Sequence, residues 1–417
     1  MNLRPAMKWL LAGAAVIAAI AIVLSLALTQ PGDINTDLPT ELEENQALTI
    51  DDPAEDNPAE DEGYVEPLLA LDSRDWENFT WDFETFADIR EPLPLDSNTP
   101  HGALAVEHIR FMNDNLYGRT PFSYREKEAA IWLVEELLAM GHPWEQIQVQ
   151  EFVVDHESRW RNLTTAARFA SDFAFRETTQ LSQNVILTIP GESEYVIIVG
   201  AHYDSWPTPG ASDNASGTSL LLESAQRMLE GENYYTIVYV FFGAEEIGMQ
   251  GSLYYALSLT EEEAEQIVLM INADVLLEGP YLFYGAAYDR EGHPGENALT
   301  RQIDALADSL DLGLIADPRV AYLSSDQLPF ILRGHTVVML SGFDKRYLDG
   351  REFIPSAAGC GSSMPGPLFP LDEYEVRTQI LHTSGDCYHF LEATWPGKVQ
   401  ANMQAFSIFL EELLMMR

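Results

Sequence analysis

Two apolar runs that each end in acidic residues or histidine constrain this chain more than any other feature of its sequence. The first run spans 196–201, the second spans 234–242, and an amphipathic segment lies between them at 214–229. Polar residues gather at the ends of the runs and at the start of the segment: His202, Asp204, Asp213, Glu245 and Glu246. A strand, a helix and a strand in this order predict a parallel pair, and open α/β sheets place their active sites at the carboxyl ends of such strands. The stretch therefore predicts an α/β fold with a polar site at one edge of its sheet.

The other apolar patterns of the chain continue this alternation. We expect strands at 147–154, 184–191, 194–202, 234–242, 267–274 and 335–342. We expect helices at 103–116, 125–141, 214–229, 295–312, 325–334 and 395–416. Strands that alternate with helices imply a mostly parallel central β-sheet flanked by helices on both faces. A chain of 417 residues is long enough for one large α/β domain with appendages.

Residues 1–31 have the pattern of a targeting segment. Two basic residues, Arg4 and Lys8, precede an uncharged apolar run, Trp9–Leu28, which is long enough to cross a bilayer as a helix. An uncleaved signal anchor is one interpretation, and a signal peptide cleaved near Ser25–Ala27 is the other. Because the positive end stays in the cytoplasm, we expect the bulk of the chain outside it, held at the cell membrane or secreted.

The charge of the chain is strongly unbalanced, with 66 acidic against 23 basic residues and a formal net charge of −43. We expect no nucleic-acid partner, because binding to phosphates needs a basic surface. Residues 32–66 are acidic and contain no Lys or Arg, which predicts a disordered linker. Residues 67–98 form an extension or pro-segment of undecided role, and we place the folded domain at 99–417.

The chain has two cysteines, Cys360 and Cys387. Two are too few for a disulfide framework or for a zinc site with four thiolates. A single Cys360–Cys387 bridge is compatible with a domain outside the cytosol, and two buried free thiols are the alternative. The oligomeric state is not readable from the sequence.

Five residues at strand ends and helix starts have side chains that bind divalent metals: His202, Asp213, Glu246, Asp274 and His382. Imidazole together with carboxylate suits zinc, and also manganese or cobalt. Two histidines and three carboxylates are more than one zinc ion needs, but they fit two ions that share one carboxylate. A paired-metal site of this kind activates water and stabilises the tetrahedral intermediate of hydrolysis. Glu245, the neighbour of Glu246, would stay free as a general base.

Five short motifs follow one another in a fixed order along the chain. They are H-x-D at 202–204, S-D-N-x-S-G at 212–217, E-E-x-G-x-x-G-S at 245–252, I-N-x-D at 271–274 and H-T-x-x-D at 382–386. In this order they resemble the M28 family of zinc peptidases, over about residues 100–417. The resemblance implies a zinc-dependent exopeptidase fold of the phosphorylase/hydrolase-like type, two Zn²⁺ ions per chain and a peptide substrate. It favours aminopeptidase activity, while carboxypeptidase activity and the preferred side chain stay open.

The resemblance also implies a role for each predicted ligand. Asp213 would bridge the two metals. His202 and Asp274 would complete one metal site, and Glu246 and His382 would complete the other. All five positions keep the residue types of the family's motifs, so the metal ligands show no departure from the pattern.

Two catalytic roles follow from the same resemblance. Glu245 would take a proton from a water or hydroxide that bridges the two zinc ions and pass it to the leaving amine. Asp204 would orient the ring of His202, as carboxylates often do for metal-binding histidines. Asp386 would support His382 in a similar way. One departure concerns Gln327, which stands where the family has a histidine near the site.

Three other interpretations compete with a two-zinc peptidase. A glutaminyl cyclase would be a single-zinc relative on the same fold, and the presence of both His202 and Asp274 speaks against it. A non-catalytic peptidase-like ectodomain would have lost metal ligands, which this chain has not. Asp213 and Asn214 could also serve only to cap the helix that follows them.

Overall fold

The computed structural model describes residues 79–86, 91–154, 181–229, 231, 233–290, 293–343, 380–383 and 385–417. All of them belong to the unit Val65–Arg417. The expected targeting segment, the acidic linker, half of the extension before residue 99 and Cys360 lie outside the described residues, so the predictions for them stay predictions. Within the described residues, no helix combines the length and the apolar character needed to cross a lipid bilayer.

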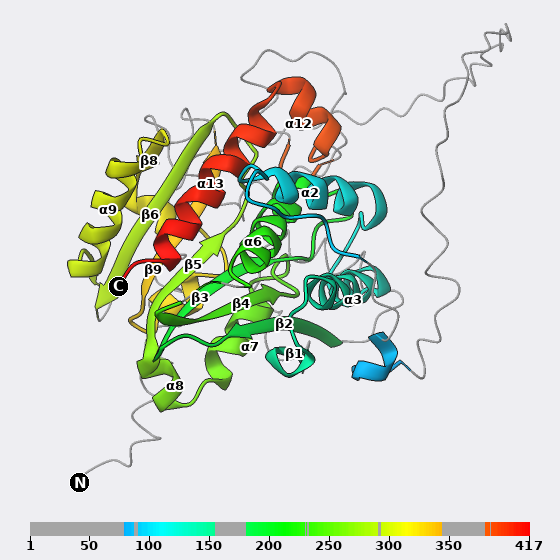
Figure 1. The fold of residues 1–417 in the computed structure, drawn as a ribbon, viewed down its shortest axis with the longest axis horizontal. Coiled ribbons are helices and arrows are strands. Elements are labelled where there is room, and N and C mark those ends of the chain that lie inside the picture. Colours follow the sequence, from blue (N-terminus) through cyan, green and yellow to red (C-terminus); the bar gives the residue numbers. More distant parts are fainter. Residues whose placement is uncertain are drawn as a thin grey trace, which may run out of the picture. The chain divides into compact units, whose positions relative to one another are not determined.

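A nine-stranded sheet runs through the described part of the chain (Figure 1). Its strands are β1 Ile147–Val153, β2 Leu181–Ile189, β3 Ser193–His202, β4 Tyr235–Phe242, β5 Ile267–Ala273, β6 Tyr281–Arg290, β7 His293–Gly295, β8 Leu314–Ala316 and β9 Thr336–Phe343. Their order is β1-β2-β4-β3-β5-β9-β6-β7, and β8 pairs with β6. Each strand that the sequence predicts is present close to its expected bounds.

The centre of the sheet is parallel, and most of the strand pairs towards its edges are antiparallel. The strands β4, β3, β5 and β9 run in one direction, whereas β1 and β2, β2 and β4, and β6 and β9 pair antiparallel. The predicted mostly parallel sheet is therefore confirmed in its centre, and the antiparallel strands at its edges make it a mixed sheet. β6 follows β5 through a short loop instead of a crossover helix, and for this reason it runs against the central strands.

Helices cover both faces of the sheet, as predicted. On one face, the larger apolar core includes residues of α2 Ala103–Asn115, α3 Tyr124–Ala139, α6 Ser216–Arg227, α9 Ala298–Leu310, α12 Tyr388–Thr394 and α13 Lys398–Leu414. On the other face, a second core includes residues of α7 Gln250–Ser258 and α10 Leu328–Ile331. Figure 1 shows α6 and α13 on the same side of the central strands. The central strands are buried on both faces, which explains why they read as continuous apolar runs.

The sequence does not predict β6, because small residues interrupt its pattern at 285–287. The structure gives the reason for these small residues. A Cβ atom on Gly285 would lie 2.5 Å from the backbone nitrogen of Ala321, in the 3₁₀ helix η6 Pro318–Tyr322. Because η6 packs closely on β6, small residues stand here in place of the β-branched and aromatic residues that are typical of strands. The tertiary contact, and not the local sequence pattern, therefore explains why this segment is a strand.

Candidate metal centre

Three neighbouring parallel strands bring polar residues to one edge of the sheet. β3 ends at His202, which lies in register with the last residue of β4. The pairing of β3 with β5 places Asp274, the residue after β5, at the same level. Glu245 and Glu246 lie in the turn that follows β4. The carboxyl ends of these strands therefore meet where the sequence predicts the site.

Asp213 lies between two histidines. Its Oδ1 is 3.1 Å from Nε2 of His202, and its Oδ2 is 3.0 Å from Nε2 of His382. The same nitrogen of His202 is 3.1 Å from Oδ1 of Asp274. The same nitrogen of His382 is 3.2 Å from Oε2 of Glu246. The five predicted ligands thus form two groups that share Asp213.

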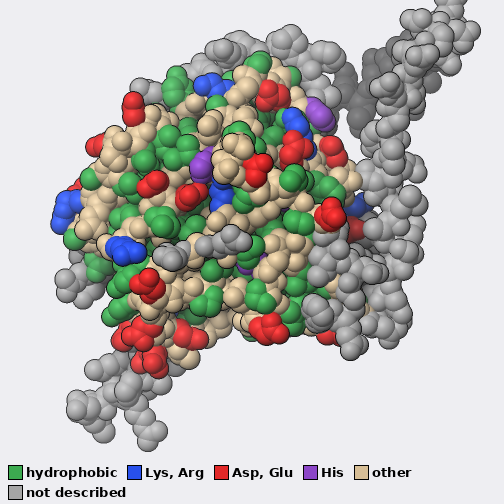
Figure 2. All heavy atoms as spheres, in the orientation of Figure 1, with side chains coloured by type: hydrophobic (Ala, Val, Ile, Leu, Met, Phe, Trp, Pro, Cys, Tyr) green, Lys and Arg blue, Asp and Glu red, His purple; other side chains and the backbone are tan. Residues whose placement is uncertain are grey.

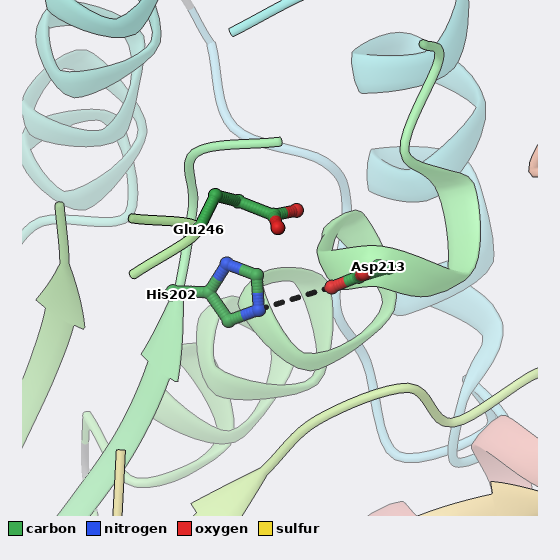
Figure 3. Close-up of side chains that lie close together, drawn as sticks. All are labelled: His202, Asp213 and Glu246. Atoms are coloured by element: carbon green, nitrogen blue, oxygen red, sulfur yellow. Dashed lines mark ion pairs between the residues drawn. The ribbon is translucent and has the colours of Figure 1, made fainter. Parts of the chain in front are cut away.

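The donor set and its spacing fit divalent metal ions. The Nε2 atom of each histidine faces two carboxylate oxygens. A single N–H proton is donated well to only one acceptor, whereas a metal ion can bind all three atoms. Ligands held about 2.0–2.1 Å from a tetrahedral zinc ion lie roughly 3.3 Å from one another, close to the 3.0–3.2 Å separations found here. The ligand atoms of His202, Asp213 and Glu246 lie within 4.8 Å of one another, and their side chains converge (Figure 3).

The centre has a strongly negative potential. Burial lowers the pKa of His202, but Asp274, Asp204 and Asp213 outweigh it and raise this pKa well above its usual range. Burial and the charge of Asp213 raise the pKa of Glu246 to about 7. Burial also raises the pKa of Asp213, but the neighbouring His202 and His382 outweigh this effect and bring the pKa below its usual range. Protons are therefore favoured at the positions where positively charged metal ions would fit.

Asn214, and not Asp213, caps the helix that follows. Oδ1 of Asn214 accepts a hydrogen bond from the N–H of Gly217 at 2.8 Å, in the first turn of α6. The Nδ2 group of Asn214 donates to the carbonyl oxygen of Ala273 at 2.9 Å, which ties the helix start to the end of β5. The peptide bond between Asp213 and Asn214 is cis. Because Asn214 does the capping, the Asp213 carboxylate is available to face the two histidines.

Asp386 supports the backbone that carries Asp213. Its carboxylate accepts hydrogen bonds from the N–H of Ser212 at 2.5 Å and from the N–H of Asp213 at 3.0 Å. Burial and the charge of Asp213 raise the pKa of Asp386 to about 7. The sequence predicts that Asp386 supports His382. These hydrogen bonds show that it also fixes the backbone of Asp213, the carboxylate shared by the two ligand groups.

Asp204 connects two strand ends. Its Oδ1 lies 3.5 Å from Nδ1 of His202. The same carboxylate accepts a hydrogen bond from the N–H of Glu245 and another from the N–H of Glu246, both at 3.1 Å. This fully buried side chain therefore contacts His202, as the sequence predicts, and it also fixes the backbone of both glutamates.

Glu245 has the environment expected of a general base. Burial raises its pKa well above the usual range; His202 opposes this shift, while Asp326 and Glu246 add to it. A carboxylate works best as a general base when its pKa lies near the working pH. The two adjacent glutamates thus differ in surroundings, since Glu246 faces His382 at 3.2 Å.

Three non-glycine residues with positive φ lie at this edge of the sheet: Ala244 at 54°, Val275 at 54° and His382 at 60°. Ala244 precedes the predicted base, and Val275 follows a predicted ligand. Positive φ is unfavourable for residues with a Cβ atom, above all for a β-branched valine. Neighbouring contacts hold such residues in place, as where the buried Glu126 accepts the N–H of Ala244 at 2.9 Å. Strained backbone of this kind gathers at functional sites.

Arg119 is a fully buried cation that the sequence analysis missed. It donates hydrogen bonds to the carbonyl oxygens of Leu116, Tyr203, Pro209 and Gly210, at 2.9, 2.7, 3.0 and 3.2 Å. Burial lowers its pKa to about 10, while Asp386 and Asp204 oppose this shift. Arg119 therefore fixes the loop between His202 and Asp213 and adds positive charge near the carboxylates. No pattern in the sequence marks it.

Trp206 is a second residue without a sequence signal, apart from its place two residues after Asp204. Its ring stacks on His382, with ring centroids 4.8 Å apart and an interplanar angle of 25°. Its backbone N–H donates to Oε1 of Glu246 at 3.2 Å. Trp206 therefore orients both side chains of the second ligand group.

Gln327, the departure from the family pattern, has a structural role in this chain. Its Oε1 accepts a hydrogen bond from Nδ2 of Asn272 at 2.9 Å. Its Nε2 donates to the carbonyl oxygens of Ala321 and Leu323, at 3.2 and 2.7 Å. Gln327 therefore ties β5 to the segment around η6, and the change from histidine leaves all five predicted ligands in place.

Comparison with known families agrees with this geometry. The family model for Peptidase family M28 matches residues 184–407, a little over half of the 417 residues. The chain belongs to peptidase family M28. The matched range contains every predicted metal ligand and both predicted catalytic residues.

This M28 chain is similar to known proteins in sequence over a short range and in structure over a longer one. Aminopeptidase YwaD from Bacillus subtilis (strain 168) is 40% identical over 103 residues, which are 24% of this chain and 23% of the relative. The chain therefore aligns with about a quarter of that relative's length. The structure of BSAP, a zinc aminopeptidase from Bacillus subtilis, matches with a TM-score of 0.56 at 16% identity, over 77% of this chain and 97% of that one.

The same fold occurs in an enzyme of a different kind. Tannerella forsythia glutaminyl cyclase matches with a TM-score of 0.51 at 17% identity, over 76% of this chain and 99% of that one. At such low identity these matches establish the fold alone. A zinc aminopeptidase and a glutaminyl cyclase share it, so the reaction has to be argued from the site.

Proposed function

We propose that this M28 chain is a zinc-dependent exopeptidase that acts as an aminopeptidase. Three findings support the proposal: the family membership, the partial identity with a Bacillus aminopeptidase, and the grouping of two histidines with three carboxylates at one sheet edge. The substrate is a peptide, and the bond cleaved is the one after its first residue.

The residues present suit two zinc ions. His202 and Asp274 would hold one ion and His382 and Glu246 the other, with Asp213 shared between them. When bound, the ions supply positive charge that acidifies an attacking water and polarises the scissile carbonyl group. The protein keeps the ligands in place through hydrogen bonds to their backbone and rings, so little reorganisation accompanies binding.

Glu245 is the proposed general base. It takes a proton from the attacking water and delivers it to the nitrogen of the leaving amine, so one carboxylate serves both halves of the reaction. The hydrogen bond from its N–H to Asp204 fixes its backbone. Because Asp204 also contacts His202, it sets the position of the base relative to a metal ligand.

One observation carries the two-metal proposal. The two oxygens of a single carboxylate, Asp213, lie at 3.1 and 3.0 Å from the Nε2 atoms of two different histidines. One zinc ion is held by three or four protein side chains, whereas five side chains gather here around the shared carboxylate.

Zinc content and peptidase activity, measured on the same purified protein, test the proposal. We expect two zinc ions per chain, hydrolysis of leucine p-nitroanilide, and loss of this activity with a chelator. One zinc with cyclisation of an N-terminal glutamine would replace the proposal by the glutaminyl cyclase interpretation. No zinc and no hydrolysis would favour a non-catalytic ectodomain. Two zinc ions without release of nitroaniline would keep the metal site but exclude leucine as the preferred residue, and move the substrate to another amino-terminal residue or to the carboxyl end.

For the segments outside the described residues we propose export through residues 1–31 and a spacer at 32–66. The support is the sequence pattern alone. Protease treatment of intact cells tests this, because an exported domain is digested from outside and a cytoplasmic one is protected.

A further inference from the structure

Glu278 is a buried carboxylate that the proposed chemistry does not use. Its side chain is only 5% exposed. Its Oε1 atom is buried without a hydrogen-bond partner among the described residues. An ionised carboxylate that loses its water and gains no partner is costly, by several kcal/mol on general grounds. A position of this kind calls for an explanation.

The loop that carries Glu278 is firmly held. The N–H of Leu276 donates to Oγ of Ser216, and the N–H of Leu277 donates to Oγ of Ser212, both at 3.1 Å. From the other side, Nδ2 of Asn402 donates to the carbonyl oxygens of Leu276 and Gly279, at 3.2 and 3.0 Å. The unpartnered oxygen therefore belongs to a well-supported loop.

Glu278 lies beside the candidate metal centre. It follows the predicted ligand Asp274 by four residues, and the N–H of its neighbour Leu277 donates to Ser212, the residue before Asp213. Burial raises the pKa of Glu278 well above its usual range; the charges of Asp386, Asp213 and Asp274 add to this shift, and that of His382 opposes it. Three of these four are proposed metal ligands, and the fourth supports Asp213. A ligand of the centre, such as the first residue of a peptide, therefore comes within reach of Glu278.

The substrate is best suited to supply the partner that Oε1 of Glu278 lacks among the described residues. Arg119, the buried arginine of this region, directs its N–H groups to backbone carbonyls. A net charge of −43 also attracts cationic peptides to the molecule. A lysine or arginine side chain brings both the positive charge and the N–H donors that a buried carboxylate requires.

We propose that Glu278 is a specificity residue that binds the cationic side chain of a lysine or arginine at the amino terminus of the substrate. The assignment rests on the proposed aminopeptidase function. The site would then discriminate between lysine and norleucine, which has the same linear side chain without the ammonium group. A hydrogen bond to a charged group predicts about 10- to 100-fold discrimination.

The experiment compares lysine and norleucine p-nitroanilides with the zinc-loaded full chain. We expect a kcat/KM ratio of lysine to norleucine of about 10 or more, which falls to near one in Glu278→Gln. Glu261→Gln, on the exposed surface of the short helix α8 Glu261–Gln266, is the matched control and keeps the ratio of the parent. Calorimetric binding of lysine amide and norleucine amide gives a second readout, and the same ratio should appear in their Kd values.

The other outcomes each contradict the assignment in a distinguishable way. An equal loss for both substrates in Glu278→Gln would mean that Glu278 binds the α-ammonium group common to them. Loss of zinc in the variant would make Glu278 a metal ligand. An unchanged ratio would leave it no role in specificity. If the zinc-loaded parent cleaves neither substrate, the proposed function itself fails, and the assignment fails with it.

Discussion

The Asp213 carboxylate offers one oxygen to each of two histidine rings, and the neighbouring side chains are arranged to keep it so. Asp386 holds its backbone N–H, and Asn214 takes over the capping of the helix. Trp206 stacks on the ring of His382. At this scale, Asp213 and His382 are each held by a neighbour that is not itself a predicted metal ligand.

Replacing Glu245 by Gln tests the general base. The amide keeps the shape of the side chain but cannot accept the proton, so kcat should fall by about 10²- to 10⁴-fold. Zinc content should stay at the level of the parent, because Glu245 is not among the five proposed ligands. Turnover of leucine p-nitroanilide together with metal analysis checks both points. A variant with more than a tenth of the parent's kcat would remove Glu245 from the mechanism.

Replacing Asp204 by Asn tests the supporting carboxylate. The change removes the charge beside Nδ1 of His202 and weakens the hydrogen bonds from two backbone N–H groups. Loss of such a partner typically weakens metal affinity by about 10- to 100-fold. Competition with a zinc chelator measures it, and Asp308→Asn on the exposed side of α9 is the control. Equal zinc affinity in Asp204→Asn and the control would contradict the role.

At the scale of elements, the site depends on the close approach of α6 to the end of β5. A Cβ atom on Gly217 would lie 2.1 Å from the carbonyl oxygen of Ala273. Asp213 lies just before α6, and Asp274 lies just after β5. The spacing of the helix from the strand therefore sets the spacing of two predicted ligands.

Gly217→Ala should separate these elements. Crowding in a packed interior costs about 1–3 kcal/mol, so the free energy of unfolding should fall by this amount and zinc binding should weaken as well. Denaturant unfolding and zinc titration of the variant measure the two effects. Unchanged stability and zinc affinity would show that this contact does not position the ligands.

His142, which follows α3, predicts a pH dependence of stability. Burial lowers its pKa from 6.5 to about 4. The unfolded chain therefore takes up a proton below pH 6.5 that the folded chain refuses, and stability falls as the pH drops from 6.5 towards 4. At pH 5 the contribution is about 2 kcal/mol.

Denaturant unfolding at pH 7.5 and pH 5 measures this contribution. The variant His142→Phe should lose about 2 kcal/mol less than the parent between the two values. Because the comparison is between parent and variant, the titration of other groups cancels. The same loss in both proteins would contradict the account.

The sequence predicts those elements whose local pattern and tertiary environment agree. The strands β3, β4 and β5 are buried on both faces, so their apolar runs mark them, and the acidic and histidine residues at their ends mark the site. β6 is missed, because its small residues are selected by the packing of η6. Arg119 and Trp206 are missed because their contacts join segments far apart in the chain. Glu278 is missed because a glutamate in a loop is ordinary in a sequence, and only the structure shows that its side chain is buried.

Acidic residues outnumber basic ones in the whole sequence, 66 against 23, and carboxylates also gather at the site. Figure 2 shows more acidic than basic side chains on the visible face, with a cluster over α8. The exposed acidic residues of this helix are Glu261, Glu262, Glu263 and Glu265. Such a surface raises the local concentration of cations, including metal ions and basic peptides. The charge of the molecule as a whole thus agrees with the chemistry proposed for its site.

The central claim is that two metal ions share the carboxylate of Asp213. The most direct test is a crystal structure of the zinc-loaded protein with anomalous diffraction measured at the zinc absorption edge. The account predicts two zinc peaks, one beside His202 and Asp274 and the other beside His382 and Glu246, with Asp213 between them. A single peak, or two peaks that leave Asp213 unligated, would contradict it.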